Sequence, residues 1–206
     1  MDYNQRGRSN VTNFKDTQII LKLAEVNSND IFCDLGCGNG NVCRWVSKKV
    51  NFVYGVEEYK KRYHSAITNI KKFRCTNVRI LNKSYCKLST LKKLRKGTIF
   101  YCTNNESLGF FKKFEKIMPK NVRFVTFYLP PYPIKPKSND EWYYLMITPF
   151  DLAKNKNDWI KSVTTRKSLQ GLITEIKEQF PDDYEERILE LEEDLTGIEW
   201  ICNKKK

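Results

Sequence analysis

The chain has 206 residues, enough for one domain with an extension, and it carries 37 basic and 24 acidic side chains for a net charge of +13. It has no apolar run of about 18 residues, and its first residues, MDYNQRGRSN, are polar, so neither a membrane span nor a signal peptide is expected. Seven scattered cysteines and the single histidine His64 argue against a disulfide framework and a metal site, and indicate a reducing compartment, cytoplasmic or nuclear, without secretion.

The apolar patterns predict an alternation of strands and helices. Strands are predicted at 31–33, 52–56, 77–84, 98–105, 121–129 and 141–150. Helices are predicted at 16–26 with Asp16 as N-cap, and at 41–49, 59–73, 86–97 and 106–118. Such alternation predicts an α/β fold, a doubly wound, mostly parallel sheet with helices on both faces. We expect this domain to cover residues 14–150, between a flexible N-terminus (1–13) and a polar, helical C-terminal extension (151–206) that contains an acidic helix.

A glycine-rich turn separates the first strand from its helix. It reads Asp34-Leu35-Gly36-Cys37-Gly38-Asn39-Gly40, and Glu57 ends the next strand 17 positions after Gly40. Glycine permits positive φ and lets a ligand approach the backbone, and an acid at the tip of strand two can hold a ribose. A glycine-rich turn without a ligand is the alternative interpretation.

The form D-L-G-x-G-x-G resembles motif I of the class I methyltransferases that use S-adenosyl-L-methionine and release S-adenosyl-L-homocysteine. The resemblance implies a seven-stranded Rossmann-like sheet. It also implies that Asp34, Gly36, Cys37, Gly38, Gly40 and Glu57 bind this cofactor.

The stretch Thr103-Asn104-Asn105, after the predicted fourth strand, resembles the corresponding part of DOT-type (non-SET) protein lysine methyltransferases and their small archaeal relatives. The resemblance implies that Asn104 or Asn105 is catalytic, beside the sulfonium and the lysine amine. Ser84, Tyr85, Thr103 and Asn104 join the residues expected to bind the cofactor. The competing interpretation is that the asparagines only stabilise their own turn through side-chain hydrogen bonds.

A lysine acceptor must lose a proton before it can accept a methyl group, and the sequence shows no obvious base. We therefore expect desolvation in an aromatic substrate channel to lower the pKa of the lysine. Its candidate walls are Thr17, Tyr128, Tyr132 and Trp142, together with Phe14.

Two alternatives to lysine methylation stay open. The stretch Leu129-Pro130-Pro131-Tyr132 resembles the N-P-P-Y motif of amino-methyltransferases that act on DNA or RNA bases, including N6-adenine enzymes. However, Leu129 lacks the side-chain acceptor of that motif, and the stretch follows strand five rather than strand four. The second alternative is a cofactor-binding scaffold without activity.

The charge is distributed unevenly along the chain. Residues 181–200 contain nine acids and one base, so the preceding body is strongly basic. A basic body predicts an anionic partner and weak, sequence-independent nucleic-acid binding. With the lysine methyltransferase resemblance, it suggests a basic protein substrate associated with DNA, such as a histone or another chromatin protein.

Overall fold

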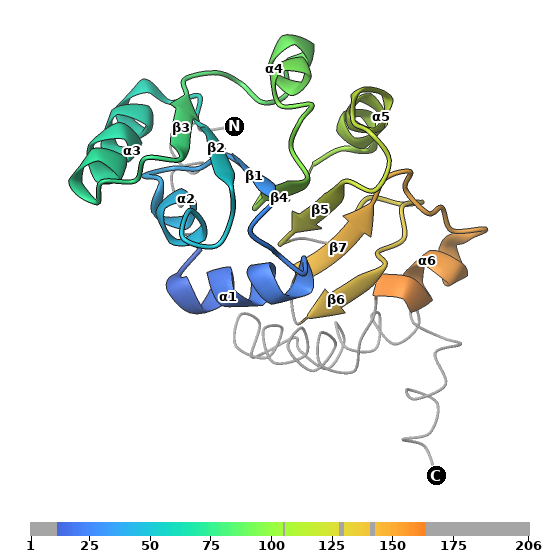
Figure 1. The fold of residues 1–206 in the computed structure, drawn as a ribbon. Coiled ribbons are helices and arrows are strands. Elements are labelled where there is room, and N and C mark those ends of the chain that lie inside the picture. Colours follow the sequence, from blue (N-terminus) through green and yellow to red (C-terminus); the bar gives the residue numbers. More distant parts are fainter. Residues whose placement is uncertain (1–11, 105, 128–129, 141–142, 164–206) are drawn as a thin grey trace, which may run out of the picture.

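The architecture is that of a computed structural model, which describes residues 12–104, 106–127, 130–140 and 143–163. Its seven strands form a single sheet in the order β3-β2-β1-β4-β5-β7-β6, with helices on both faces (Figure 1). The strands are β1 (Ile31–Leu35), β2 (Phe52–Val56), β3 (Val78–Leu81), β4 (Ile99–Cys102), β5 (Arg123–Thr126), β6 (Ser138–Asp140) and β7 (Tyr143–Ile147). The helices are α1 (Phe14–Leu23), α2 (Asn41–Val46), α3 (Lys60–Lys72), α4 (Leu88–Lys93), α5 (Leu108–Ile117) and α6 (Lys156–Val163). The predicted doubly wound, mostly parallel sheet is confirmed.

The sheet direction places one set of loops together. Strands β1 to β5 pair in parallel, whereas β7 runs antiparallel to both β5 and β6. The carboxyl ends of β1, β2, β3 and β4 therefore meet at one edge of the sheet, where ligands bind in open α/β folds. We call this edge the carboxyl edge.

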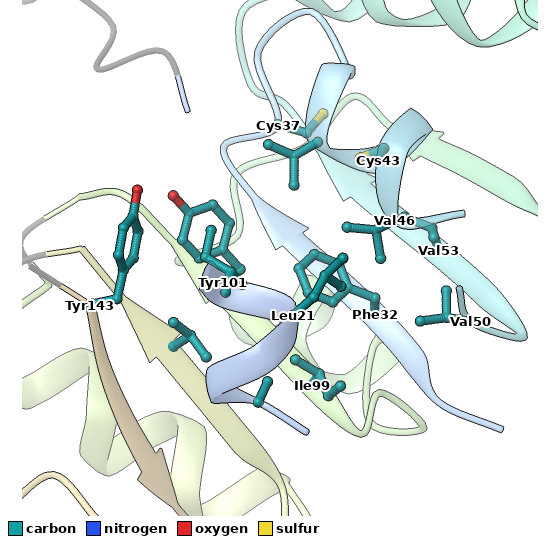
Figure 2. Packing of buried hydrophobic residues seen from close by; sticks show 14 of the residues in the cluster. Leu21, Phe32, Cys37, Cys43, Val46, Val50, Val53, Ile99, Tyr101 and Tyr143 are labelled. Carbon is teal, nitrogen blue, oxygen red and sulfur yellow. The ribbon is translucent and has the colours of Figure 1, made fainter. Parts of the chain in front are cut away.

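Alternating side chains of the buried strands build a core layer on each face of the sheet. Figure 2 shows one layer, in which Phe32, Val53 and Tyr101 of the sheet pack with Leu21 of α1 and Val46 of α2. The other layer is rich in phenylalanine and is formed by β4, β5, α4 and α5. Strand β4 is covered on both faces, and all four of its residues are buried and hydrophobic.

Helix α1 begins two residues earlier than predicted. Its N-cap is Asn13, not Asp16, because the Asn13 side chain accepts from the Asp16 backbone N–H at 2.9 Å. The Asp16 carboxylate in turn accepts from the Asn13 N–H at 3.2 Å, which completes a capping box. Just before it, the hydroxyls of Thr12 and Tyr101 are 2.7 Å apart, so the chain is tied to the sheet from residue 12 onward.

Residues 130–140, which lie between two predicted strands, contain a further strand that the sequence did not predict. Ser138–Asp140 pairs with Tyr143–Leu145 as the edge strand β6. These three polar residues lack the alternation of apolar and polar side chains by which a strand is predicted. Their extended conformation depends on pairing with β7. Within the C-terminal extension, α6 lies in the described part, while residues 1–11, residues 164–206 and the predicted acidic helix lie outside it.

Candidate active site

The three glycines of the turn after β1 all have positive φ: +89° at Gly36, +56° at Gly38 and +77° at Gly40. Their surroundings differ. A Cβ at Gly40 would lie 3.2 Å from the Cβ of Ala66, so this glycine allows α3 to approach the turn. In contrast, Gly36 is exposed and Gly38 has nothing within 4 Å of its Cβ position, so these two leave backbone open to a ligand.

Glu57 follows β2 and is nearly buried, with 4% of its surface exposed. One carboxylate oxygen accepts from the Gly38 N–H and the other from the Tyr59 N–H, both at 2.9 Å. The acid at the tip of strand two therefore holds the glycine turn in place. A carboxylate has about four lone-pair sites, so both oxygens can still accept from ligand hydroxyls.

Asp34 lies in β1 and is buried against the start of α2. Burial raises the pKa of its carboxyl from 3.8 to about 7. The thiol of Cys43 donates to this carboxylate at 3.4 Å and partly opposes the rise, whereas the charge of Glu57 adds to it. A buried carboxylate whose pKa lies near neutrality needs a cation nearby to be fully charged. Cys37 is also buried. A hydrogen bond with Cys43 lowers the pKa of its thiol, but burial and the charges of Asp34 and Glu57 outweigh this and raise the pKa overall, so Cys37 serves packing rather than nucleophilic chemistry.

A hydrogen-bonded cluster joins the loops after β3 and β4. The hydroxyl of Tyr85 donates to Glu106 Oε1 at 2.5 Å and accepts from Asn104 Nδ2 at 2.5 Å. The Tyr85 ring lies beside the open turn, since its Cε1 is 3.8 Å from where a Cβ of Gly36 would be. Burial, together with the thiol of Cys102 and the Glu106 acceptor, raises the pKa of Tyr85, so its hydroxyl keeps its proton. We call Tyr85, Asn104 and Glu106 the tyrosine cluster.

Sequence reasoning missed Glu106, which was assigned to the start of a helix. Its partner Tyr85 is 21 positions away, and the two meet only because β3 and β4 end at the same edge of the sheet. Tyr59 was missed too. It is 59% exposed, and an aromatic two positions after the strand-two acid Glu57 was the available signal.

The remaining predicted site residues differ in burial and position. Ser84 and Thr103 are half-buried in the two loops that carry the tyrosine cluster. Thr17 is fully buried, and its hydroxyl donates to the Asn13 carbonyl at 2.9 Å, so it belongs to the packing of α1 and not to the wall of an open channel.

Two predicted wall residues are exposed but pack elsewhere. Tyr132 is 49% exposed, and its ring lies edge-on to Trp159 of α6 at 6.2 Å. Phe14 is 55% exposed and lies edge-on to Trp45 at 5.5 Å. The predictions for Asn105, Tyr128 and Trp142 fall on positions outside the described residues.

Among the residues that the structure describes, no group of three or more His, Cys, Asp or Glu side chains is placed to hold a metal ion. Within the same ranges, none of the helices has the length and apolar character needed to cross a membrane.

Comparisons with known proteins agree with this fold, although no family model matches the chain. It is 32% identical over 110 residues to a protein-lysine N-methyltransferase of Saccharolobus islandicus, which covers 52% of this chain and 67% of that protein. It is 33% identical over 94 residues to a probable cobalt-precorrin-6B C(15)-methyltransferase (decarboxylating) of Methanococcus vannielii, covering 46% of this chain and 49% of the relative. The chain spans about half or less of the cobalt-precorrin relatives that it matches.

A solved structure shows the same fold. The RNA methyltransferase from Salinibacter ruber in complex with S-adenosyl-L-homocysteine has a TM-score of 0.58 and 16% identity, and the match covers 70% of this chain and 97% of that one. The relatives differ in methyl acceptor but share the methyl transfer. With the confirmed sheet order and the open glycine turn, these similarities place the chain in the family of class I S-adenosylmethionine-dependent methyltransferases.

Proposed function

We propose that the protein transfers a methyl group from S-adenosyl-L-methionine to a lysine amine of a protein. The observation that carries this proposal is the tyrosine cluster, which places a carboxylate and an amide beside the open glycine turn. One partial relative, the Saccharolobus protein-lysine N-methyltransferase, supports the same acceptor class.

The residues at the carboxyl edge suit this cofactor. Gly36 and Gly38 offer open backbone, Glu57 offers acceptor sites for a ribose diol, and Asp34 offers a buried carboxylate for a cationic group such as an ammonium. When bound, S-adenosylmethionine supplies a methyl group that its sulfonium has already activated. The protein then needs to align the acceptor and exclude water.

The acid in the tyrosine cluster favours a lysine over a nucleic-acid base. A lysine side chain arrives as an ammonium and must lose a proton, whereas the exocyclic amine of a base arrives neutral. In the proposal, Glu106 attracts the ammonium to the site, the desolvated ammonium releases its proton to solvent, and the Tyr85 hydroxyl holds Glu106 in place. The Asn104 amide, fixed on the same hydroxyl, orients the neutral amine through its carbonyl oxygen.

Transfer of labelled methyl tests the proposal directly. The full chain is incubated with labelled cofactor and, in separate reactions, with histones, a lysine-rich peptide, RNA, DNA and a precorrin-type tetrapyrrole. We expect label on lysine only. Label confined to RNA, DNA or the tetrapyrrole would overturn the lysine proposal, and no label in any arm would support a scaffold without activity.

A pair of acid variants tests the role of Glu106. Glu106→Gln keeps the size of the side chain and removes its charge, so kcat/KM for a lysine peptide should fall by about a hundredfold. Glu58→Gln removes an exposed acid nearby and should leave the rate within about twofold. Equal rates in Glu106→Gln and the parent protein would remove Glu106 from the site.

A further inference from the structure

A long part of the chain contains bases and no acids. Between Glu58 and Glu106 the sequence has 13 Lys and Arg residues and not one Asp or Glu, although acids make up 24 of the 206 residues overall. The ion pairs found in the described ranges involve Arg123 and Lys135, so none of the bases in this stretch is neutralised by a carboxylate there. Unpaired bases at this density form a surface for an anionic partner.

The structure gathers five of these bases at the carboxyl edge. Lys60, Lys61 and Arg62 open α3 just after β2, and Lys83 and Lys87 flank Tyr85 in the loop after β3. We call these five residues the basic rim. Four are exposed and Arg62 is half-buried.

The two loops of the basic rim are joined. The Asn82 side chain donates to the carbonyl oxygens of Glu57 and Glu58 at 2.9 and 3.0 Å, which ties the end of β3 to the end of β2. Strand β3 is the outer strand of the sheet, and α3 lies beside β3 at that end of the molecule (Figure 1). The bases therefore form one surface next to the candidate active site, with Glu58 as its local acid.

An exposed aromatic ring stands within the basic rim. Tyr59 is 59% exposed, and the Arg62 guanidinium carbon lies 5.4 Å from the centre of its ring. Single-stranded nucleic acid is bound by a combination of two features: basic side chains that follow the phosphate backbone, and an aromatic ring on which a nucleobase can stack. An acidic protein would pair with the charges of the basic rim but has no nucleobase to stack on Tyr59.

We propose that the basic rim and Tyr59 bind single-stranded nucleic acid across the mouth of the candidate active site. This binding does not depend on which group accepts the methyl. It holds a strand beside the site whether the strand carries the protein substrate or lies next to it. Its failure would leave the lysine proposal intact, and the reverse is equally true.

Two variants with equal loss of charge test the proposal. The rim variant is Lys60→Gln, Lys61→Gln, Lys83→Gln and Lys87→Gln. The control variant, Lys15→Gln, Lys22→Gln, Lys112→Gln and Lys116→Gln, removes four exposed bases from α1 and α5, which also carry acids. Affinity for labelled single strands of roughly 12 nucleotides, RNA and DNA, is measured by fluorescence anisotropy at several salt concentrations. Melting temperature confirms that each variant is folded.

The rim variant should bind at least about tenfold more weakly than the parent, and its salt slope should be smaller by about 3, because four phosphate contacts are lost. The control variant should stay within about threefold. Tyr59→Ala should weaken the binding of single strands and leave the binding of duplexes unchanged, whereas Glu58→Gln should tighten the binding of single strands.

Three results would overturn the proposal. Equal losses in the rim and control variants would show that only net charge acts. Preference for duplex over single strands would show a phosphate surface without stacking. Binding of polyglutamate as tight as that of RNA would show a surface for acidic protein.

Discussion

At the residue scale, Glu57 has two tasks, since it holds the glycine turn and offers its remaining acceptor sites to a ligand. Glu57→Ala should weaken S-adenosylhomocysteine binding by about 1.5–3 kcal/mol, because charge-assisted hydrogen bonds are lost. It should also lower the melting temperature, since Gly38 and Tyr59 lose their acceptors. Calorimetry and thermal unfolding measure both effects, with Glu58→Ala as the exposed control. Unchanged affinity would show that Glu57 does not contact the cofactor.

Asp34 makes stability depend on pH. Its pKa is about 7 in the folded protein against an ordinary value of 3.8, so the folded state binds the extra proton between these values. Stability from this group is complete below about pH 4 and is lost as the pH rises through 7. Asp34→Asn removes that loss. The free energy of unfolding of the cofactor-free variant should therefore exceed that of the parent by on the order of 2–4 kcal/mol at pH 8 and by almost nothing at pH 4.

Urea denaturation of both proteins at the two pH values measures the gain from Asp34→Asn. The same variant should bind the cofactor more weakly at pH 8, where the parent carries the negative charge. A gain in stability that is equal at pH 4 and pH 8 would mean that Asp34 keeps its ordinary pKa.

Within the tyrosine cluster, Asn104→Ala should lower turnover by about a hundredfold and leave cofactor affinity within a few-fold, because in the proposed function its amide orients the acceptor amine. Tyr85→Phe removes the hydroxyl shared by Asn104 and Glu106 and should lower turnover to a similar extent. Asn105→Ala completes the comparison. If Asn104→Ala loses melting temperature and activity together, the asparagine only stabilises its turn; full activity in both asparagine variants would exclude the pair from catalysis.

At the element scale, the sequence predicted the strands whose apolar pattern follows from burial. It did not predict the strand that depends on pairing, or the contact that depends on sheet order. Strand β4 and the run 31–33 of β1 are hydrophobic because both faces of these strands are covered, so their pattern was visible. In contrast, β6 exists because β7 pairs with it. The meeting of Tyr85 with Glu106 depends on sheet order, which no local pattern of residues contains.

A pair of glycine substitutions separates a packed element from an open one. A Cβ at Gly55 in β2 would lie 2.6 Å from Ile80 Cδ1 and 2.9 Å from the sulfurs of Cys37 and Cys43, so Gly55→Ala should cost about 1–3 kcal/mol. Gly109 in α5 has an open Cβ position, with Ser107 Oγ at 3.6 Å, so Gly109→Ala should stabilise by about 0.5 kcal/mol. Chemical denaturation measures both. Equal stabilities would contradict the tight packing at Gly55.

At the scale of the whole molecule, the charge of +13 and the acid-free stretch imply that the folded protein repels itself. Raising the salt concentration from about 20 to 200 mM screens this repulsion, so the melting temperature of the cofactor-free protein should rise. The rim variant, with four fewer charges, should show a smaller rise. A melting temperature that falls with salt would show that favourable ion pairs outweigh the repulsion.

The crowding around Gly55 also constrains how this sequence can diverge. The side chains at 37, 43 and 80 all reach the space that a methyl group on residue 55 would occupy. A descendant with alanine at 55 is therefore expected to carry a smaller side chain at one of the other three positions. Because residue 37 lies in the glycine turn and residue 43 in the helix that follows it, sequence change in β2 is coupled to sequence change in the turn. In an alignment of related sequences, the pairwise covariation among positions 37, 43, 55 and 80 should exceed that between position 109 and its neighbours.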